Sequence, residues 1–494
     1  MHFLLNQNSI PTDLGEINPN TTVLEWLRGN QLVGSKEGCA SGDCGACTAV
    51  IGELVTNSKT SKIEYKSINT CIALAYGLVG KHLVTVEGLT EQGKLHPVQK
   101  AMVIENGSQC GFCTPGFVMS LFALYQNKNS VNLHQINEAL SGNLCRCTGY
   151  KPIIAAAFSI FNEKDNEPLD YYKKNQKQIT TIIGKLNNPK NISVSYTKSN
   201  KTIKYDAPST ISELSNVLIN NSSSAHIVAA GTDLNLEITQ SMKEFSHIVS
   251  VNQVIELKEV KDGASELEIG AAVSYEDAAS SLISNWPDLG AFLQRFASLP
   301  IKNWATIGGN IANASPIGDM PPVLIALDAK LKLRKGSDTR IINLEDFFIT
   351  YKNTDIKQGE FIESIIISKP KENHRLITHK MTKRYEDDIS AVCMAVNITT
   401  KNNKPESFKI AFGGMSGIPQ RAQKLEKVLL KDWENNDIAT IAYKVLKEEF
   451  SPFTDVRASS EYRLQVSANL VKKTILMYQN EPVENLAEYS QSSQ

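Results

Sequence analysis

Four cysteines near the start of the 494-residue chain have a spacing that suits metal ligation. Cys39, Cys44 and Cys47 form a C-x4-C-x2-C pattern, and Cys71 follows as a fourth thiol. Four thiolates in this spacing hold a [2Fe–2S] cluster. The sequence therefore predicts one such cluster in this part of the chain.

A second group of four cysteines follows. Cys110 and Cys113 form C-x2-C, and Cys145 and Cys147 form C-x-C. Together they supply four more thiolates, which is the number that a second cluster needs. Two redox centres in one chain predict a protein that conducts electrons.

Disulfides and structural zinc are the competing interpretations of these cysteines. The start, MHFLLNQNSIPTD, turns polar after five residues and lacks the apolar core of a secretory signal, so we expect reduced thiols. Zinc accepts four thiolates that include a C-x2-C pair. However, Gly38, Gly42 and Gly45 allow positive φ and bring N–H donors close to bridging sulfides, which tetrahedral zinc does not require. The first group therefore favours iron–sulfur over zinc. The ninth cysteine, Cys393, lies in a largely apolar run and is interpreted as a small buried hydrophobe.

The elements around the first group are short. Apolar runs at 3–5, 48–51 and 83–86 and a helical stretch at 22–28 predict a small β-rich domain with one helix. This composition suits a ferredoxin-like β-grasp.

The second group lies in a helical region from about residue 97 to 161. Val118, Leu121, Phe122 and Tyr125 fall on one helical face, and residues 133–140 mark a second helix. Pro115 and Pro152 each follow a cysteine pair, where a proline is tolerated at the start of a helix. Helix N-termini carry free N–H groups and positive partial charge, which suit an anionic cluster. The pattern predicts a four-helix bundle around the second cluster.

The rest of the chain mixes strands and helices and contains two glycine-bearing turns. One is Ile227–Leu234, an apolar strand running into a turn, and the other is Ala305–Asn310, followed by Ala314–Asp319. Glycines with Thr, Ser and Asn donors can surround phosphate oxygens, although many such turns serve backbone geometry alone. Neither G-x-G-x-x-G nor a P-loop motif occurs, so any dinucleotide site here is not of the Rossmann type.

Charge and hydropathy restrict the partners. The chain has 51 basic and 52 acidic side chains and a net charge of −1, which gives no electrostatic case for nucleic acid or an anionic membrane. No apolar stretch is long enough to span a bilayer. We expect a soluble, cytoplasmic protein.

Four segments together resemble the xanthine dehydrogenase family of molybdenum hydroxylases. They are Gly38–Cys47 (GCASGDCGAC), Gln109–Gly116 (QCGFCTPG), Gly142–Tyr150 (GNLCRCTGY) and Thr306–Pro316 (TIGGNIANASP). Their order implies a ferredoxin domain, a helical cluster domain and a flavin domain. The chain is similar to the small subunit of a two-subunit bacterial xanthine dehydrogenase, and no residues remain for the molybdopterin domain of that family.

The resemblance implies an FAD site with identifiable residues. The residues it assigns to FAD are Val228, Ala229, Ala230, Gly231, Thr232, Asp233 and Leu234 in the first turn, and Thr306, Gly308, Gly309, Asn310, Ser315 and Asp319 in and after the second. Phe296 resembles the family's aromatic residue beside the isoalloxazine, and Lys380 a basic residue near the flavin ring. One departure is Ala230, because family members often carry glycine there and a Cβ could hinder close phosphate approach.

Three acidic residues, Glu386, Asp387 and Asp388, resemble an acidic loop near the flavin and the NAD site, with a solvated charge cluster as the alternative. Gln109 matches a glutamine near the molybdenum cofactor, which implies that the surface around it meets a partner. Arg146, between two ligands, could tune the nearer cluster by its charge.

The fold expected is a multidomain α+β chain. We predict a ferredoxin-like domain over 1–87, a helical cluster domain over 88–162, a linker over 163–200, a non-Rossmann FAD-binding domain over 201–375, an associated α+β subdomain over 376–485 and a tail over 486–494.

The resemblance implies electron transfer during hypoxanthine and xanthine oxidation. Electrons would pass from molybdopterin on a large partner subunit through two [2Fe–2S] clusters to FAD and then to NAD⁺. The assembly would be a heterodimer or a pair of heterodimers. Two alternatives stay open, which are a small subunit of a hydroxylase for aldehydes or N-heterocycles, and an iron–sulfur flavoprotein that does not reduce NAD⁺.

Overall fold

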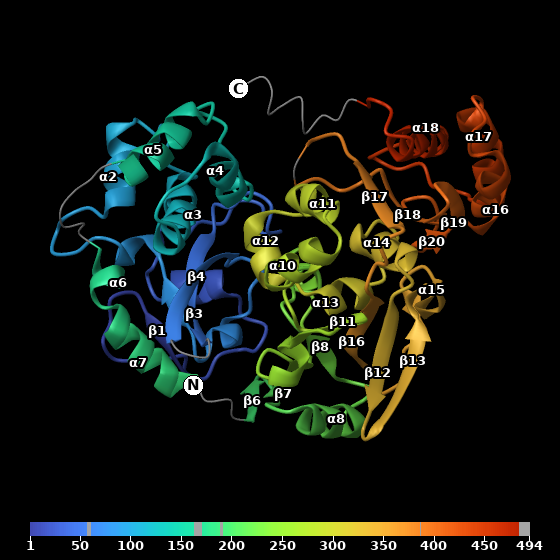
Figure 1. The fold of residues 1–494 in the computed structure, drawn as a ribbon. Coiled ribbons are helices and arrows are strands. Elements are labelled where there is room, and N and C mark those ends of the chain that lie inside the picture. Colours follow the sequence, from blue (N-terminus) through green and yellow to red (C-terminus); the bar gives the residue numbers. More distant parts are fainter. Residues whose placement is uncertain (57–60, 163–169, 188–190, 386, 484–494) are drawn as a thin grey trace. The chain divides into compact units, whose positions relative to one another are not determined.

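The computed structural model describes residues 1–56, 61–162, 170–187, 191–385 and 387–483 (Figure 1). The chain divides into two compact units. Unit 1 is Met1–Ile255 with Ser298–Ala305, and unit 2 is Glu256–Ala297 with Thr306–Gln494. Each unit is described by itself.

Unit 1 begins with a five-stranded sheet in the order β2-β1-β5-β3-β4, drawn in blue in Figure 1. Strands β1 and β5 are parallel and the other pairs are antiparallel. Helix α1 (Val23–Gly29) packs its apolar face on the sheet, and a capping box of Thr22 and Glu25 fixes its start. The strands are β1 (His2–Leu5), β2 (Thr12–Asp13), β3 (Thr48–Thr56), β4 (Ser61–Asn69) and β5 (His82–Val84). The predicted β-rich domain with one helix is therefore confirmed.

Four helices follow, as the cysteine and proline positions predicted. They are α2 (Pro97–Ile104), α3 (Thr114–Asn127), α4 (Leu133–Leu140) and α5 (Lys151–Asn162). Helix α3 is central, because every residue from Gly116 to Tyr125 is buried. Its side chains share one apolar core with Ile136 of α4 and Ile153 of α5.

The segment predicted as a linker contains ordered elements among its described residues. Helices α6 (Tyr171–Lys174) and α7 (Gln176–Leu186) bury Tyr172, Ile179 and Ile183 in the core of the helical domain. Strand β6 (Ile192–Lys198) then pairs with β7 (Lys201–Ala207). The lysine-rich composition reflects the exposed faces of these elements. It gave no indication that these three side chains are buried. The domain boundaries themselves remain predictions.

A small α/β layer completes unit 1. Its sheet has the order β6-β7-β9-β8, and β9 (His247–Ser250) is parallel to both β7 and β8 (His226–Val228). The remaining helices of unit 1 are α8 (Ile211–Asn220), α9 (Leu236–Thr239) and α12 (Leu299–Trp304), and α12 packs on β4 of the first sheet. The first glycine-bearing turn leaves the carboxyl end of β8, at an edge where parallel strands commonly place ligand-binding loops.

Unit 2 contains two antiparallel sheets of five and four strands. The first has the order β10-β11-β16-β12-β13, with β14 (Phe348–Thr350) and β15 (Asn353–Thr354) as a separate pair. Its strands are β10 (Val260–Asp262), β11 (Glu266–Gly270), β12 (Lys330–Lys335), β13 (Asp338–Asn343) and β16 (Phe361–Ser368). The helices of unit 2 that lie between these strands in the sequence are α10 (Tyr275–Asn285), α11 (Leu289–Arg295), α13 (Ile307–Ala312), α14 (Met320–Ala326) and α15 (Leu344–Phe347).

The second sheet of unit 2 has the order β17-β18-β19-β20. Its strands are β17 (His374–Met381), β18 (Val392–Lys401), β19 (Lys404–Gly413) and β20 (Gln420–Arg421), and its helices are α16 (Gln423–Asp432), α17 (Ile438–Glu449) and α18 (Ser460–Tyr478). Cys393 on β18 is fully buried, as the apolar run around it predicted. The predicted tail lies outside the described residues.

Within the described ranges, none of the helices combines the length and the apolar character that a membrane crossing requires.

Candidate iron–sulfur and flavin sites

The antiparallel hairpin of β3 and β4 brings two of the first four cysteines together. Cys47 directly precedes β3, Cys71 follows β4, and the strand register pairs Thr48 with Asn69. The two cysteines therefore meet at one end of the hairpin, where their Sγ atoms are 3.3 Å apart and both residues are buried.

The other two cysteines belong to a tight loop before β3. The backbone N–H groups of Ser41, Asp43 and Cys44 donate to Cys39 Sγ at 3.3–3.4 Å. This wrapping needs left-handed backbone at Ala40, Gly42 and Gly45, where φ is 53°, 83° and 68°. Hydrogen bonds from the Cys44 thiol and from Ser41 lower the pKa of Cys39 to about 4. The loop thus stabilises a thiolate, and the thiolate is the form of cysteine that binds iron.

All eight cysteines form hydrogen-bonded pairs. In each pair the pKa of one thiol is lowered and that of its partner is raised, with the lowered member first: Cys39 and Cys44, Cys47 and Cys71, Cys110 and Cys147, and Cys145 and Cys113. Each iron of a [2Fe–2S] cluster takes two thiolates, so four thiols in two close pairs fit one cluster. In the described ranges no three His, Cys, Asp or Glu side chains gather as a single metal ion would require.

The second cluster site uses a helix start. Cys113 is the N-cap residue of α3, with a proline in the first turn. The Thr148 hydroxyl and backbone N–H donate to Cys145 Sγ at 3.1 and 3.4 Å, and these bonds lower the pKa of Cys145 against the effect of burial. Cys110 and Cys147 are exposed, unlike Cys47 and Cys71. This site therefore lies nearer the surface of unit 1.

The two cluster loops contact each other directly. The Leu144 N–H donates to Cys44 O at 3.0 Å, which joins the residue before ligand Cys145 to a ligand of the first site. The Lys36 ammonium donates to Gly111 O at 2.8 Å, between Cys110 and Cys113. The sequence predicted both ligand sets but gave no sign of these links.

Asn143 is the buried centre of this junction. Its amide donates to Gly45 O and Thr48 Oγ1, both at 3.2 Å, and accepts from Ser120 Oγ at 2.6 Å. Replacing Asn143 with alanine should destabilise unit 1 by about 2–3 kcal/mol, because the buried Ser120 hydroxyl loses its acceptor and the hydrogen bonds to Gly45 O and Thr48 Oγ1 are also lost. Differential scanning calorimetry should show a lower Tm for this variant. Asn30→Ala, which removes one local bond at the end of α1, should change the Tm little; equal Tm values for the two variants would contradict the prediction.

The first glycine-bearing turn lies in unit 1. Val228 ends β8, Gly231 has a φ of 75°, and Ala230 does not adopt left-handed backbone. Ala230 is buried, and its carbonyl accepts a hydrogen bond from Trp304 Nε1 at 2.9 Å. Val228, Ala229 and Ala230 line a small cavity with Tyr205 and Trp304. The turn thus tolerates alanine at position 230 in the geometry that the chain adopts; the assignment of Thr232, Asp233 and Leu234 to FAD stays a prediction.

The second turn lies in unit 2, at the start of α13. Thr306 caps the helix by accepting from Gly309 N at 3.1 Å. Gly308 packs on Ala271, where a Cβ would lie 2.5 Å from the Ala271 carbonyl oxygen. Gly309 is exposed on the first turn. Gly308 is therefore needed for packing, whereas Gly309 leaves open space at the helix start.

Two further predicted residues form a buried ion pair in unit 2. Lys380 Nζ, on β17, donates to the Asp319 carboxylate, to Asp388 O at 2.7 Å and to Ser390 Oγ at 3.0 Å. Both charged residues are buried, so each charge is compensated by the other. The predicted pairing of Lys380 with a flavin ring remains untested, and the structure shows its protein partners.

Unit 2 also holds four buried polar atoms that find no hydrogen-bond partner within the described ranges, and three of them belong to Asn310 (Oδ1), Asp319 (Oδ1) and Tyr275 (OH). Buried polar groups are normally satisfied, so such atoms mark places where a ligand or water would bind. The Tyr275 and Phe296 rings are tilted by 49° with their centroids 4.5 Å apart, and burial raises the pKa of the Tyr275 phenol well above its ordinary value. These atoms fit a ligand rich in hydroxyl and N–H groups, such as FAD, and Tyr275 is a residue that the sequence analysis missed.

The acidic loop is only partly a solvated cluster. Asp388 accepts the N–H groups of Lys383 and Arg384 at 3.1 and 2.9 Å, so it shapes the loop. Asp387 has a φ of 46° and is half-buried, and Glu386 lies outside the described residues. Arg295, which the sequence analysis also missed, donates to Lys380 O at 2.8 Å and lies 4.9 Å from the Tyr385 ring.

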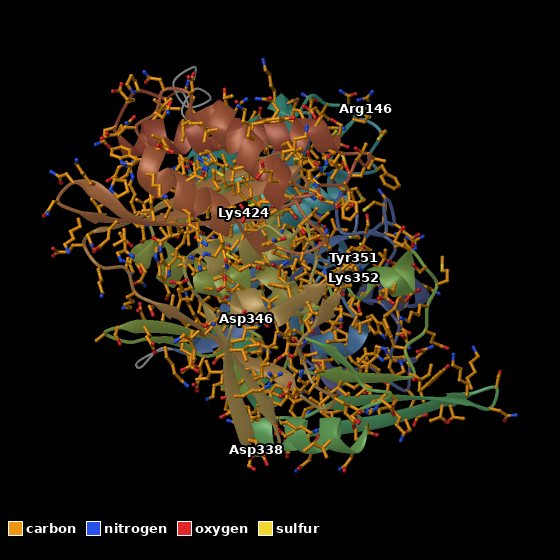
Figure 2. All side chains as sticks on the ribbon, turned by 90° about the vertical axis from the view of Figure 1, so that its right-hand side faces the viewer. Arg146, Asp338, Asp346, Tyr351, Lys352 and Lys424 are labelled. Carbon is orange, nitrogen blue, oxygen red and sulfur yellow. The ribbon has the colours of Figure 1, made fainter. Side chains whose placement is uncertain are left out.

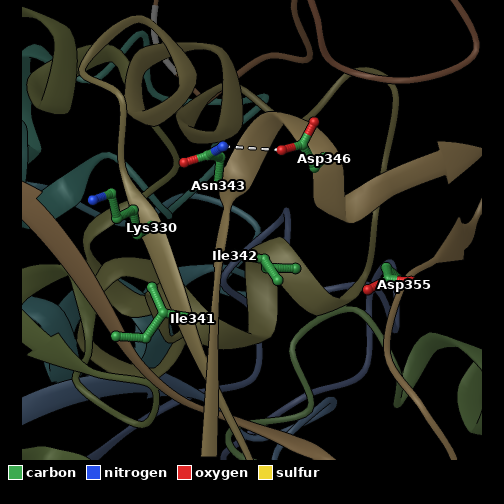
Figure 3. A pocket seen from close by; sticks show the side chains of 6 residues that line it. All are labelled: Lys330, Ile341, Ile342, Asn343, Asp346 and Asp355. Carbon is green, nitrogen blue, oxygen red and sulfur yellow. Dashed lines mark hydrogen bonds between the residues drawn. The ribbon is translucent and has the colours of Figure 1, made fainter.

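An open pocket in unit 2 contains none of the predicted site residues (Figure 3). It is lined by Lys330, Ile341, Ile342, Asn343, Asp346 and Asp355. The hydrogen bond of 3.0 Å from Asn343 to Asp346 is drawn in the figure. The pocket is a mixed apolar and charged surface feature, and we assign no cofactor to it.

Four family models match consecutive parts of the chain. The 2Fe-2S iron-sulfur cluster binding domain matches residues 13–76, and the [2Fe-2S] binding domain matches 85–158. The FAD binding domain in molybdopterin dehydrogenase matches 201–370, and the CO dehydrogenase flavoprotein C-terminal domain matches 377–478. The chain therefore carries two [2Fe–2S] domains and an FAD-binding domain.

Curated relatives and solved structures agree with this assignment. A xanthine dehydrogenase of Emericella nidulans is 32% identical over 87% of this chain and 35% of its own length, and xanthine dehydrogenase/oxidase of Mus musculus is 31% identical over 87% and 35%. The chain thus spans about a third of the length of these relatives. A Cu,Mo-CO dehydrogenase chain (TM-score 0.52, 23% identity, 55% of this chain and 94% of that one) shares the fold. Quinoline 2-oxidoreductase of Pseudomonas putida also shares the fold (TM-score 0.51, 23% identity, 56% of this chain and 96% of that one).

The domain order and the relatives define an iron–sulfur flavoprotein of the molybdenum hydroxylase class. Within that class, the chain belongs to the xanthine dehydrogenase family.

Proposed function

We propose that this chain is the electron-transfer subunit of a xanthine dehydrogenase. A partner subunit with molybdopterin would hydroxylate hypoxanthine and xanthine with oxygen from water. The two electrons released would pass singly through the two clusters, reduce FAD, and leave as a hydride to NAD⁺. The cofactors supply the redox chemistry, and the protein sets their spacing and potentials.

The observation that carries this proposal is the direct contact between the cluster loops. Leu144, next to ligand Cys145, donates its N–H to the carbonyl of ligand Cys44 at 3.0 Å. A single hydrogen bond thus separates the backbone of one ligand set from that of the other. This arrangement supports electron flow between the helical and the ferredoxin clusters.

The exposure of the second site supports its role as the entry point. Cys110 and Cys147 are exposed, and so is the neighbouring Gln109. Phe112, Leu144 and Tyr150 beside them leave 47%, 49% and 36% of their surface exposed. Apolar side chains around an exposed redox site suit burial by a partner chain. Arg146, also exposed and labelled in Figure 2, adds a positive charge to this face.

A hydroxylase with another substrate is the second candidate. The solved structures that share this fold include a CO dehydrogenase and a quinoline 2-oxidoreductase, so the same electron-transfer architecture serves different substrates. In this case FAD could also pass electrons to an acceptor other than NAD⁺.

Purification of a tagged chain from its native cells tests these alternatives. We expect a large molybdenum-containing partner, and a complex that reduces NAD⁺ with xanthine or hypoxanthine. The chain without its partner should oxidise NADH with an artificial acceptor and should not oxidise xanthine. A complex active on aldehydes, quinoline or CO but inactive on purines would support the second candidate, and a chain found only as a free monomer would contradict the subunit assignment.

A further inference from the structure

Three side chains of unit 1 connect the first flavin turn to the first cluster site. They belong to residues 235–240, a segment that contains helix α9 and directly follows the turn at 228–234. Asn235 Nδ2 donates to Ile72 O at 2.7 Å, next to ligand Cys71. The Thr239 hydroxyl donates to Ala40 O at 2.8 Å. Gln240 Nε2 donates to Ala40 O at 2.9 Å and to the carbonyl of ligand Cys39 at 3.1 Å.

These three donors reach both loops that supply the ligands. Ile72 follows the buried ligand Cys71, whereas Cys39 and Ala40 start the other loop. Ala40 has a φ of 53°, a conformation that alanine rarely adopts without support from its surroundings. Two donors converge on its carbonyl, so the segment stabilises the loop where its backbone is most strained.

The other end of the segment is attached to the flavin turn. The Asn235 N–H donates to Gly231 O at 2.8 Å, and Asn235 is fully buried. A Cβ on residue 231 would lie 2.1 Å from Asn235 Nδ2, so only glycine allows this approach. Asn235 therefore contacts the flavin turn through its backbone and the cluster loop through its side chain.

We infer that Asn235, Thr239 and Gln240 are positioning residues that fix the distance between the ferredoxin-type cluster and the flavin turn and thereby set the rate of electron transfer between them. The inference rests on the proposed function only for the direction of flow. Each reduced cluster gives up one electron and returns to its oxidised form. When bound, FAD would take two electrons in two such steps, with two protons from solvent.

Variants at the accessible end of the segment provide the test. Thr239→Val and Gln240→Met together remove three hydrogen bonds at nearly constant shape. In the full chain with its clusters and flavin, pulse radiolysis delivers single electrons, and absorbance follows their exchange between cluster and flavin. We expect exchange to be about tenfold slower or more. Loss of the hydrogen-bonding partners around metal ligands typically lowers metal affinity or activity by about 10–100-fold. The EPR spectrum of the ferredoxin-type cluster should also change, while iron and FAD content should not.

A matched control exists in the same segment. Glu237 forms an exposed ion pair with Lys243 and contacts neither cluster loop by a hydrogen bond among the described residues. Glu237→Gln should leave the exchange rate and the EPR spectrum unchanged. Asn235→Leu is the second test variant and should slow exchange in the same way.

The outcome is independent of substrate and acceptor, because the experiment uses no partner, purine or NAD⁺. If the complex of the chain with its partner fails to oxidise purines while the variants of the chain alone show slowed exchange, the proposed function is contradicted and the positioning role is supported. Parental exchange rates and EPR spectra in both the double variant and Asn235→Leu would overturn the positioning role alone.

Discussion

Replacing Cys44 with alanine is expected to remove the ferredoxin-type cluster and to leave the helical-domain cluster in place. The parent chain should contain about four irons and four acid-labile sulfides, and the variant about two of each, because each [2Fe–2S] cluster needs four thiolates. Electron exchange with the flavin should fall below detection, since the cluster beside the flavin turn is lost. Metal analysis and low-temperature EPR measure these effects.

The reason for a selective loss is the separation of the two ligand sets. Cys44 pairs with Cys39 in the loop before β3, whereas Cys113 and Cys145 pair beside the start of α3. The contact between the two loops runs through backbone atoms, from Leu144 N to Cys44 O, and an alanine at position 44 keeps that carbonyl. The second site should therefore keep its geometry.

Cys393→Ala is the matched control. Cys393 is fully buried on β18 in unit 2, whereas the eight predicted ligands all belong to unit 1. This variant should keep both EPR signals. Loss of both signals from folded Cys44→Ala would show that the two sites depend on each other, and zinc in place of iron in the parent chain would refute the cluster assignment.

The ligand sets could be predicted from sequence because their information is local. Cys39, Cys44 and Cys47 lie within one short loop, and Pro115 and Pro152 mark the helices that follow the second set. The pairing of thiols could not be predicted in this way. Cys47 meets Cys71 because β3 and β4 pair in a specific register, and that register depends on the whole sheet.

The contacts that connect the sites were also invisible in the sequence. Asn143, Asn235 and Gln240 are ordinary polar residues without a motif, and their roles arise from partners that are distant in the chain. The segment 163–200 is a related case, since Tyr172 and Ile183 lie in short apolar runs within a stretch rich in lysine and asparagine. The average composition of such a segment does not reveal these buried residues, although each one buries a large side chain.

Of the residues assigned to the flavin, some features could be predicted from the sequence and others could not. The turn at 306–310 could be predicted from the sequence because Thr306 and two glycines form a compact helix start. The buried ion pair of Lys380 with Asp319 could not be predicted, because Lys380 lies on β17 and the two residues are 61 positions apart in the sequence. Each had been assigned to the flavin separately, and their mutual contact means that changing one would leave the other as an uncompensated buried charge.

Replacing Gly309 with tryptophan is expected to abolish FAD retention. Gly309 is exposed on the first turn of α13, and in the described part of the chain an added Cβ would come close to one atom, Thr306 Oγ1, at 2.8 Å. The Thr306 side chain must shift to make room for the Cβ, and the fold of unit 2 should then tolerate a side chain that fills the space in front of the helix start. If that space holds FAD phosphates, affinity should fall by about 100-fold or more, which corresponds to about 3 kcal/mol. Flavin absorbance after gel filtration and FAD titration of the apoprotein measure the loss.

Two comparisons isolate the cause of this loss. Ala312→Trp places the same side chain on an exposed position one turn further along α13, away from the helix start, and should keep FAD. Gly308→Ala should instead destabilise unit 2, because its Cβ would lie 2.5 Å from the Ala271 carbonyl oxygen. Both cluster EPR signals should persist in Gly309→Trp, since all eight ligands belong to unit 1. Normal flavin content in Gly309→Trp would mean that FAD phosphates do not occupy the start of α13, and the assignment of Thr306, Gly309 and Asn310 to the cofactor would then be wrong.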